Sequence, residues 1–310
     1  MPIQLRMVIC LVFCLAFYSC SSFSNSKAGA DKIQSSLSKG DDIYYDDVII
    51  TESLNLIDTN AAVQTTPVLK AVYIHSAIVF KNCTFKGAIM GSLKGSNQAS
   101  YSATFLKNLY FDNCVFEEDV NLEGATINGY CNFLNCTFKK AGLFNRTTFS
   151  STVSFSKSTF METGGFQQCT FMGSTFFNEA HFYDACFFQN SYFYRDFTFS
   201  LAACKGYTDF NQANFYSNMF CNYAHFSKGL SFNDSNFRGR TEFVGSEFMK
   251  AEFDGSTFYV RSFFDKSTFS ENLSLKDCRF ISRKPETTSY SAGKLDISGV
   301  EVSGAKMVEF

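Results

Sequence analysis

The sequence predicts an all-β solenoid, and two observations support this fold class. From Cys131 to Phe193 the chain can be written in steps of eleven residues, with aromatic side chains at the third and eighth positions of each step. The composition agrees, because 39 Phe, no Trp and only 3 Pro indicate one core environment used many times. Two steps make one coil, and units that bury their apolar face only against their neighbours form a stacked repeat architecture.

The repeat places apolar residues in four columns that advance by 22 residues per coil. The columns begin at Phe111, Phe116, Leu122 and Ile127. A single-residue deletion between Phe248 and Phe258 shifts the spacing once. The residues that we expect in the core include Phe133, Phe138, Phe144, Phe149, Phe155, Phe160, Phe166, Phe171, Phe182 and Phe193.

A second pattern supports the inward direction of these columns. The residue two positions before each apolar centre of the second and fourth columns is always small, as in Cys136, Ser158 and Cys169. Residues two apart on an extended chain point to the same side, so the small residue also faces inward. Two residues after the centres, residues that tolerate a positive φ recur, and we expect corners there. They include Gly124, Gly129, Asn135, Gly173, Gly239, Gly245 and Gly255.

Blocks such as Ala251–Gly255 and Ser256–Val260 have the form small-x-Phe-x-x, and they resemble pentapeptide repeats. The alternating spacing is similar to that of the branch with eleven-residue, Phe-centred double units, and the resemblance covers about two-thirds of the chain. It implies a right-handed quadrilateral β-helix, in which each block forms one face. With neighbouring coils about 4.8 Å apart, roughly nine coils would form a rod about 45 Å long.

The N-terminus predicts export. Arg6 precedes an apolar run from Met7 to Tyr18, which is too short to span a bilayer and is typical of a secretory signal. The residues that end at Cys20 resemble a bacterial lipobox, so we expect residues 1–19 to be a signal peptide and Cys20 to be lipidated. An ordinary cleaved signal is the alternative. The location that follows is the cell envelope, as a membrane-anchored lipoprotein.

The rest of the chain divides by composition and by the phenylalanine pattern. Residues 20–40 are rich in Ser, Lys and Ala and predict a flexible tether. Residues 41–76 lack the repeat and predict an N-terminal cap, whereas 77–282 form the solenoid, with a loop insertion near 91–108. Pro285 ends the repeat, and 283–310 predict a C-terminal cap or tail.

Cys83, Cys114 and Cys136 form the sharpest cluster of candidate site residues. They occupy the same inward position on three successive coils, so their Cα atoms are expected about 4.8 Å apart, which is within disulfide range. An exported protein permits oxidation, but stacked parallel side chains have poor dihedral angles for a bridge. Buried free thiols are the alternative.

Other candidate residues carry weaker signals. His75, His181 and His225 are scattered, and we expect them on the surface. We interpret five N-glycosylation sequons as by-products of the repeat: Asn82, Asn135, Asn145, Asn233 and Asn272. No zinc signature, Gly-rich phosphate loop or nucleophile elbow is present in the sequence, so no metal, no cofactor and no catalytic residue is predicted.

Three function classes remain open. The first is a non-catalytic envelope scaffold with an unknown protein partner and no evident small-molecule substrate. The second is a glycan-binding module that uses outward aromatic residues, namely Tyr183, Phe187, Tyr192, Tyr194 and Tyr216. The third is a gyrase-binding DNA mimic, a role that the family resemblance brings in. The formal charge of −2 argues against a nucleic-acid binder, which needs a basic face.

Overall fold

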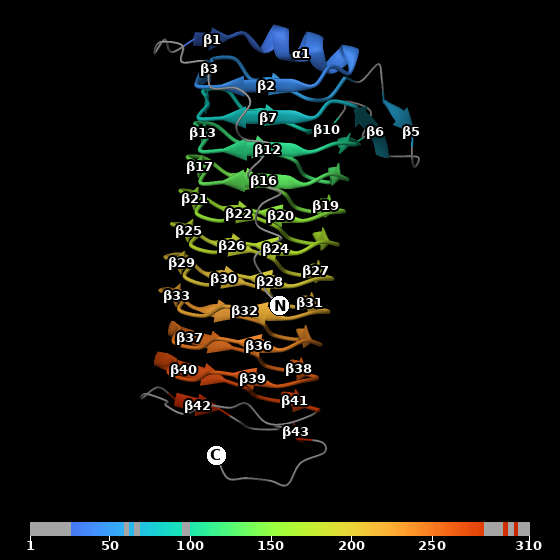
Figure 1. Ribbon diagram of the computed structural model, residues 1–310. Coiled ribbons are helices and arrows are strands. Elements are labelled where there is room, and N and C mark those ends of the chain that lie inside the picture. Colours follow the sequence, from blue (N-terminus) through green and yellow to red (C-terminus); the bar gives the residue numbers. More distant parts are fainter. Residues whose placement is uncertain are drawn as a thin grey trace, which may run out of the picture.

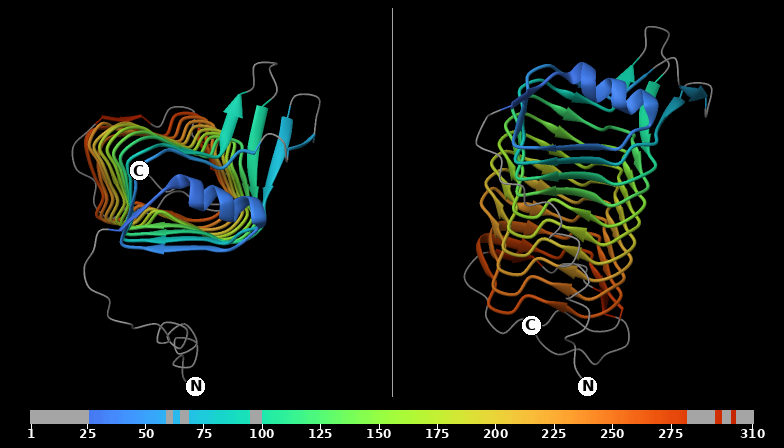
Figure 2. Two further views of the ribbon diagram at one scale, coloured as in Figure 1. Left: turned by 90° about the horizontal axis from the view of Figure 1, so that it is seen from above. Right: turned by 45° about the horizontal axis from the view of Figure 1, so that its top comes forward.

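The computed structural model describes residues 26–58, 62–64, 69–94, 100–281, 294–296 and 301–302. They form a right-handed quadrilateral β-helix of about eleven turns, so the expected nine is too low. The additional turns lie at the two ends, where the phenylalanine pattern is absent. Figure 1 shows the coils stacked along one axis, and the view from above in Figure 2 shows their four-sided outline.

In the regular part of the rod each coil contributes one short strand to each of four faces, and each of these strands pairs in parallel with the strand of the next coil. Face 1 contains β2 (Ile43–Asp46), β7 (Ile78–Lys81), β12 (Leu109–Asp112), β16 (Cys131–Leu134), β20 (Val153–Ser154), β24 (Thr175–Phe176), β28 (Phe197–Thr198), β32 (Met219–Phe220), β36 (Thr241–Glu242) and β39 (Ser262–Phe263). Face 2 contains β1 (Ser26–Ala28), β3 (Val48–Ile50), β8 (Thr84–Phe85), β13 (Val115–Phe116), β17 (Thr137–Phe138), β21 (Thr159–Phe160), β25 (His181–Phe182), β29 (Ala203–Cys204) and β33 (His225–Phe226).

The other two faces continue the same stack. Face 3 contains β4 (Leu54–Asn55), β9 (Ile89–Met90), β14 (Val120–Asn121), β18 (Gly142–Leu143), β22 (Gly164–Gly165), β26 (Cys186–Phe187), β30 (Thr208–Asp209), β34 (Leu230–Ser231) and β42 (Lys294–Asp296). Face 4 contains β6 (Leu69–Ile74), β11 (Ser100–Phe105), β15 (Thr126–Ile127), β19 (Thr148–Phe149), β23 (Thr170–Phe171), β27 (Tyr192–Phe193), β31 (Asn214–Phe215), β35 (Asn236–Phe237), β38 (Thr257–Phe258), β41 (Arg279–Phe280) and β43 (Glu301–Val302). Two longer strands, β37 (Glu247–Glu252) and β40 (Thr268–Ser274), belong to faces 2 and 3 together.

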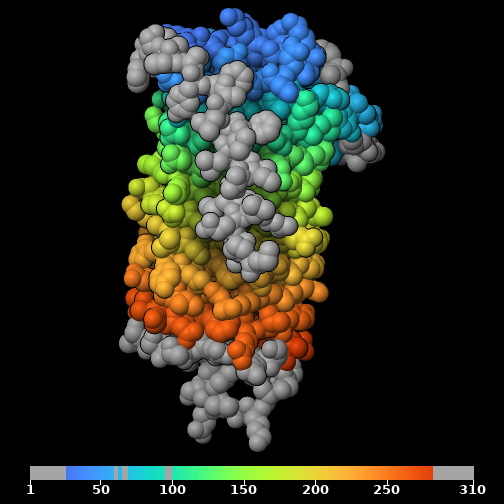
Figure 3. All heavy atoms as spheres, in the orientation of Figure 1, coloured from blue at the N-terminus to red at the C-terminus, as the bar shows by residue number. Residues whose placement is uncertain are grey.

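Stacked phenylalanine rings fill the axis of the rod. The rings of Phe138 and Phe160 lie 4.4 Å apart and within 3° of parallel, and Phe149 lies 5.0 Å from Phe171. The pairing of Thr148 with Thr170 shows the 22-residue register directly. All ten phenylalanines expected in the core are at most 1 % exposed. Figure 3 shows the outer surface of this rod, with colours that run from blue at one end to orange-red at the other.

The small inward residues do more than leave space for the rings. The Ser191 hydroxyl donates to the Phe166 carbonyl at 2.7 Å and accepts from the Cys169 backbone N–H at 3.0 Å. The Cys169 thiol makes the equivalent bond to the Phe144 carbonyl at 2.9 Å. Each of these side chains therefore bonds a carbonyl at a buried corner, where an unpaired group is costly.

The corners are of two kinds, and only one of them was expected. After the first and third columns φ is positive, for example 54° at Asn135 and 66° at Gly124. Gly129, Gly173 and Gly239, which follow the fourth column, do not have positive φ. They are required for space instead, because a Cβ at Gly173 would lie 2.3 Å from the Ser151 carbonyl carbon.

One coil departs from the four-column pattern in a compensated way. Cys204 stands where the second column otherwise has phenylalanine, and the Phe199 ring fills that place by stacking on Phe182 at 5.8 Å and on Phe226 at 6.0 Å. Phe197 points inward beside Phe199, at a ring distance of 5.8 Å. The large inward side chain of Phe197 on face 1 thus offsets the small side chain of Cys204 on face 2, which keeps the interior closely packed.

The N-terminal end corrects the predicted tether. Residues 26–40 contain β1, which pairs with β3, and α1 (Ala30–Lys39), which lies across the open end of the first coil (Figure 2). Ala30 and Ile33 are buried and Leu37 is half-buried, so one helix face covers the core. Gly40, at φ 76°, ends the helix; its N–H donates to the Leu37 carbonyl, and the Asp41 N–H donates to the Ser36 carbonyl.

Residues 41–76 do not form a separate cap. Their strands β2, β3, β4 and β6 pair in parallel with the next coil, as Ile43 with Ile78, so this segment is an irregular first coil. The insertion near 91–108 contains β10 (Ser92–Lys94) and lengthens β11, which pairs antiparallel with β10. With β5 (Val63–Gln64) and β6 they form a four-stranded wing that projects from the rod (Figure 2).

In the C-terminal part of the rod, the one-residue deletion lies where the sequence places it. The deletion removes one corner, so β37 runs straight from face 2 to face 3, with Phe226 opposite Phe248 and Leu230 opposite Ala251. Beyond the predicted solenoid, β42 and β43 pair with β40 and β41 at a spacing of 22, as Arg279 with Glu301. The ladder therefore continues into the segment expected as a C-terminal cap.

The ring stack makes a strong prediction for stability. Phe171→Ala removes a fully buried ring between Phe149 and Phe193, and we expect a loss of about 3–5 kcal/mol in the free energy of unfolding. Met172→Ala is the matched control, because the Met172 side chain lies on the outer wall next to Phe171 and is 45 % exposed. Denaturant unfolding that gave equal losses for both variants would contradict the core assignment.

The compensated coil makes a second prediction. Cys204→Phe restores the repeat pattern but inserts a ring where Phe199 already lies, so we expect it to destabilise by about 1–3 kcal/mol. Adding Phe197→Val, the residue type found at Val153 in an earlier coil, should recover part of that loss by making room. The comparison needs denaturation midpoints of both single variants and the double variant. If the stability changes of the two single variants simply added in the double variant, Phe197 would not be making up for the small side chain at Cys204.

Candidate functional site

The thiols expected as a stacked cluster are free and buried. The Cys83 thiol donates to the Lys81 carbonyl at 3.0 Å and the Cys114 thiol to the Phe80 carbonyl at 3.5 Å. The hydrogen bond between the Cys114 and Cys136 side chains, together with burial, raises the pKa of Cys114 to about 12. The pKa of Cys83 is also raised. Protonated thiols of this kind are poor nucleophiles and poor metal ligands.

The other predicted site residues lie apart from one another. His75, His181 and His225 are exposed; His181 Nδ1 lies 2.9 Å from the Glu179 carbonyl and His225 Nδ1 lies 2.9 Å from Glu247. In the part of the chain that the structure describes, no group of three His, Cys, Asp or Glu side chains could hold a metal ion. Cys20 lies outside the described residues.

Four of the five sequon asparagines lie at corners of the coil, whereas Asn272 lies within β40. Asn82 and Asn135 have positive φ, and Asn113 between them donates to Asn82 at 2.8 Å and accepts from Asn135 at 3.0 Å. Asn145 and Asn233 instead accept bonds from backbone N–H groups of the following coil. These roles explain why the repeat selects asparagine there.

Two acidic residues are buried among those that the structure describes, and they do not form an acid/base pair. Asp209 lies on face 3, where burial raises the pKa of its carboxyl group and Gln189 donates to it at 2.6 Å. Glu242 lies on face 1, where it binds Arg240 at 2.5 Å and Asn222 at 2.8 Å. Glycoside hydrolysis and similar chemistry need two carboxyl groups that face one substrate, and these two point from different faces.

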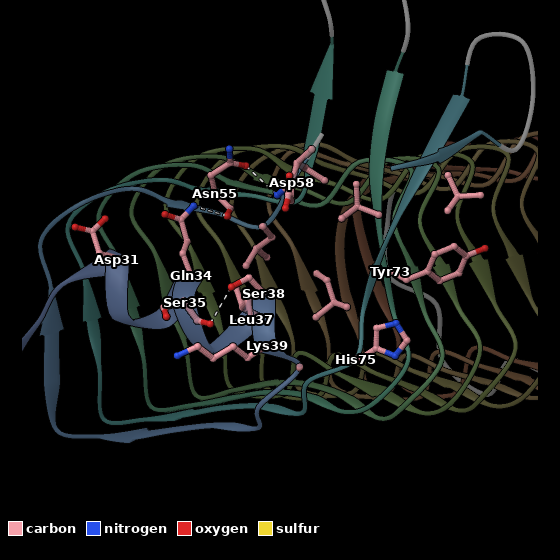
Figure 4. Close-up of a pocket in the computed structure, with 16 residues that line it drawn as sticks. Asp31, Gln34, Ser35, Leu37, Ser38, Lys39, Asn55, Asp58, Tyr73 and His75 are labelled. Atoms are coloured by element: carbon pink, nitrogen blue, oxygen red, sulfur yellow. Dashed lines mark hydrogen bonds between the residues drawn. The ribbon is translucent and has the colours of Figure 1, made fainter. Parts of the chain in front are cut away.

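An open groove of about 1090 Å³ lies between α1 and the inner part of the wing. Figure 4 shows Gln34 and Lys39 on the helix side, with Tyr73 and His75 across from them. Gln34 donates to the Asn55 carbonyl at 2.9 Å, which joins the helix to the end of β4. The floor is apolar and the rim is charged, an arrangement that suits a protein contact.

Three of the outward tyrosines expected to contact glycans have a ring face that is covered by a neighbour. Tyr194 and Tyr216 stack on each other at 4.8 Å and within 6° of parallel, so these two ring faces cover one another. The Lys205 ammonium lies 4.0 Å from the Tyr183 ring centroid and covers one of its faces. Glycans pack on exposed ring faces, and the covered faces of these rings do not offer that contact.

Tyr194 and Tyr216 belong to an outward column that continues to Arg238, and this column contains a feature that was not predicted from the sequence. The Arg238 guanidinium lies between the rings of Tyr216 and Tyr259, at 5.0 and 5.3 Å from their centroids. Three further arginines lie along the same corner between faces 4 and 1. We call this set the arginine corner; it consists of Arg195, Arg238, Arg240 and Arg261, with Tyr194, Tyr216 and Tyr259.

A hollow of about 460 Å³ opens at this corner. It is lined by Asn218, Gly239, Arg240, Val260, Arg261 and Phe263. The Arg240 guanidinium lies 4.5 Å from the Phe263 ring centroid. The signal was available in the sequence, because Tyr194, Tyr216 and Arg238 are 22 residues apart, but only the inward columns were compared at that spacing.

Comparisons with known proteins agree with the repeat. Residues 101–147 match the family model described as "Pentapeptide repeats (9 copies)". The chain is thus similar to pentapeptide-repeat proteins, and the 22-residue register of the matched part continues in the coils that follow it. No curated protein matches the chain.

Two solved structures illustrate the similarity. One is a trypsin-treated form of QnrB1, a plasmid-mediated fluoroquinolone resistance protein, with 16 % identity over 64 % of this chain and 91 % of that one, at a TM-score of 0.22. The other is HetL, a pentapeptide repeat protein involved in heterocyst differentiation regulation in the cyanobacterium Nostoc sp. strain PCC 7120. It shares 12 % identity over 63 % of this chain and 86 % of that one, at a TM-score of 0.16. Values this low carry no functional conclusion.

The helix in the described part of the chain is neither long nor apolar enough to cross a bilayer.

The buried thiols predict a pH dependence of stability. Burial raises the pKa of Cys169, so the native state keeps this proton when the unfolded thiol ionises above about pH 8.5. The unfolded state then binds fewer protons than the native state, and stability falls as pH rises, by up to about 1.4 kcal/mol per unit for each thiol.

Cys169→Ser isolates this effect, because serine at the equivalent Ser191 makes the same hydrogen bond without titrating near this pH. We expect the unfolding free energy of the wild type to fall relative to that of the variant from pH 8 to pH 10, measured by denaturant unfolding with reductant present. A constant difference across this range would show that the thiol ionises equally in both states.

Proposed function

We propose that the chain is a non-catalytic pentapeptide-repeat scaffold that is exported, held at the cell envelope by a lipid on Cys20, and engaged by a protein partner. One observation carries the scaffold role. In the described residues the interior is filled by side chains, and several outer carboxylates are held by neighbouring coils, as Glu117 by Lys139 at 3.1 Å and Glu162 by Lys140 at 2.8 Å.

Such a rod presents fixed surfaces rather than a reaction centre. The groove between α1 and β6 is where we expect the protein partner, because it combines an apolar floor with the charged groups Asp31, Lys39 and Asp58. A rigid repeat scaffold also loses little conformational freedom when a partner binds, which favours association.

The charge pattern favours a scaffold over a gyrase-binding DNA mimic. A mimic needs a run of unpaired carboxylates on one face, to replace phosphates. Here Glu123, Glu179 and Glu247 each lie within 4 Å of a cationic or histidine side chain on an adjacent coil. The chain also exposes the arginine corner, which would repel a surface that binds DNA.

Export and anchoring rest on residues 1–20. A basic residue, an apolar run and a cysteine stand in the order that a lipoprotein signal requires. One lipid chain gives only reversible membrane binding, so stable anchoring needs more than one acyl group on Cys20.

Cys20→Ala should abolish lipid attachment. We expect labelled fatty acid on the wild-type chain, recovered in the membrane fraction of a bacterial host, and no label on this variant. Cys14→Ala is the matched control, because Cys14 lies within the apolar run and should not affect labelling. An unlabelled, unprocessed wild-type protein in the cytosol would overturn the localisation and leave the scaffold fold untouched.

A further inference from the structure

The arginine corner combines four features that point to a ligand: two guanidinium groups with no carboxylate partner among the described residues, a flanking hollow, tyrosine hydroxyls on the outer wall and a straight course along the rod. From these we propose that it binds an extended acidic polysaccharide, through the carboxylate or sulfate groups that the polymer carries. This deepens the envelope scaffold proposed above, on which it rests, by naming a ligand class for a surface that the scaffold role does not use.

The charge of the corner is open to an anion. Arg195 and Arg238 are not buried, and no carboxylate of the described residues lies within 4 Å of either guanidinium. Asp196, the acidic group beside Arg195, accepts from the Ser217 hydroxyl at 2.6 Å and the Asn218 N–H at 3.1 Å. Arg240, by contrast, is paired with the mostly buried Glu242.

Arg238 is held in position before any ligand arrives. Contact with the rings of Tyr216 and Tyr259 restricts its guanidinium group and leaves N–H groups free to face outward. A planar guanidinium binds carboxylate and sulfate oxygens through paired hydrogen bonds. Because the side chain is already ordered, binding costs less conformational entropy than an unstacked arginine would require.

The hollow beside Arg238 is lined by Gly239, Arg240 and Arg261. A Cβ at Gly239 would lie 2.2 Å from the Ser217 carbonyl carbon, so glycine is required for the close approach of the two coils at this wall. From Arg195 to Arg261 the corner spans three coil steps, or about 14 Å at the spacing between strands. A short stretch of a linear polymer can follow this line with its charges facing the arginines.

The chemistry of the corner selects among anionic polymers. Single-stranded nucleic acids stack their bases on exposed aromatic faces, and Tyr194 and Tyr216 cover each other. An acidic peptide gains affinity from apolar anchors in deep pockets, and this hollow is shallow and edged by arginine. Sugar hydroxyls, by contrast, suit the tyrosine hydroxyls, which both donate and accept.

The test measures binding of the full-length chain to short oligosaccharides at low ionic strength. The probes are sulfated heparin fragments, carboxylated oligogalacturonate, a neutral maltooligosaccharide and single-stranded DNA of similar charge. We expect both acidic saccharides to bind, the neutral one not to bind, and Arg195→Gln with Arg238→Gln to weaken binding about tenfold. The stronger of the two acidic probes identifies sulfate or carboxylate as the preferred group.

Lys139→Gln with Lys140→Gln is the matched control, since it removes the same charge at a distant corner. Circular dichroism checks that each variant keeps its fold. The proposal is overturned if neither acidic saccharide binds, if the control pair weakens binding equally, or if DNA binds as tightly with the same dependence on Arg195 and Arg238. The assay does not involve Cys20, so a failure of lipid labelling would remove the envelope location without affecting this result.

Discussion

The parallel stacking of one phenylalanine ring on the next is the interaction on which the rest of the rod depends. Strand pairing alone would tolerate a range of spacings between coils near about 4.8 Å and several lateral shifts. The rings remove that freedom, because Phe144 on Phe166 at 5.1 Å and 3° leaves one favourable alignment. Inward rings in four columns then force the chain to turn four times per coil, and the corners follow from that requirement.

The four columns and the coil could be predicted because large and small side chains recur at fixed spacings in the sequence. Alternating spacings of five and six place Phe133 and Phe138 on adjacent faces, and small residues such as Cys136 mark the inward positions between them. The deletion near Phe248 could also be located, since it changes a spacing. What spacing does not describe is the hydrogen bonding of the inward serines, which depends on carbonyls 25 residues earlier.

The ends and the outer surface were harder to predict for physical reasons. The ten-residue helix α1 has only Ala30, Ile33 and Leu37 on its apolar face, and in isolation so short a helix is marginal. It is stable because it covers an open core, which is a tertiary effect. The arginine corner was missed because outward residues are not constrained by packing, so only contacts between coils, such as Arg238 between two tyrosines, distinguish them from ordinary surface.

The coil around Phe197 bears on how such a rod can change over time. Phe199 belongs to one column by position but fills another column by contact, between Phe182 in the preceding coil and Phe226 in the following one. A duplication or transplant that moved this coil alone would bring Cys204 without the neighbours that close its gap. In this region the heritable building block is therefore a group of adjoining coils, although the sequence repeats with every single one.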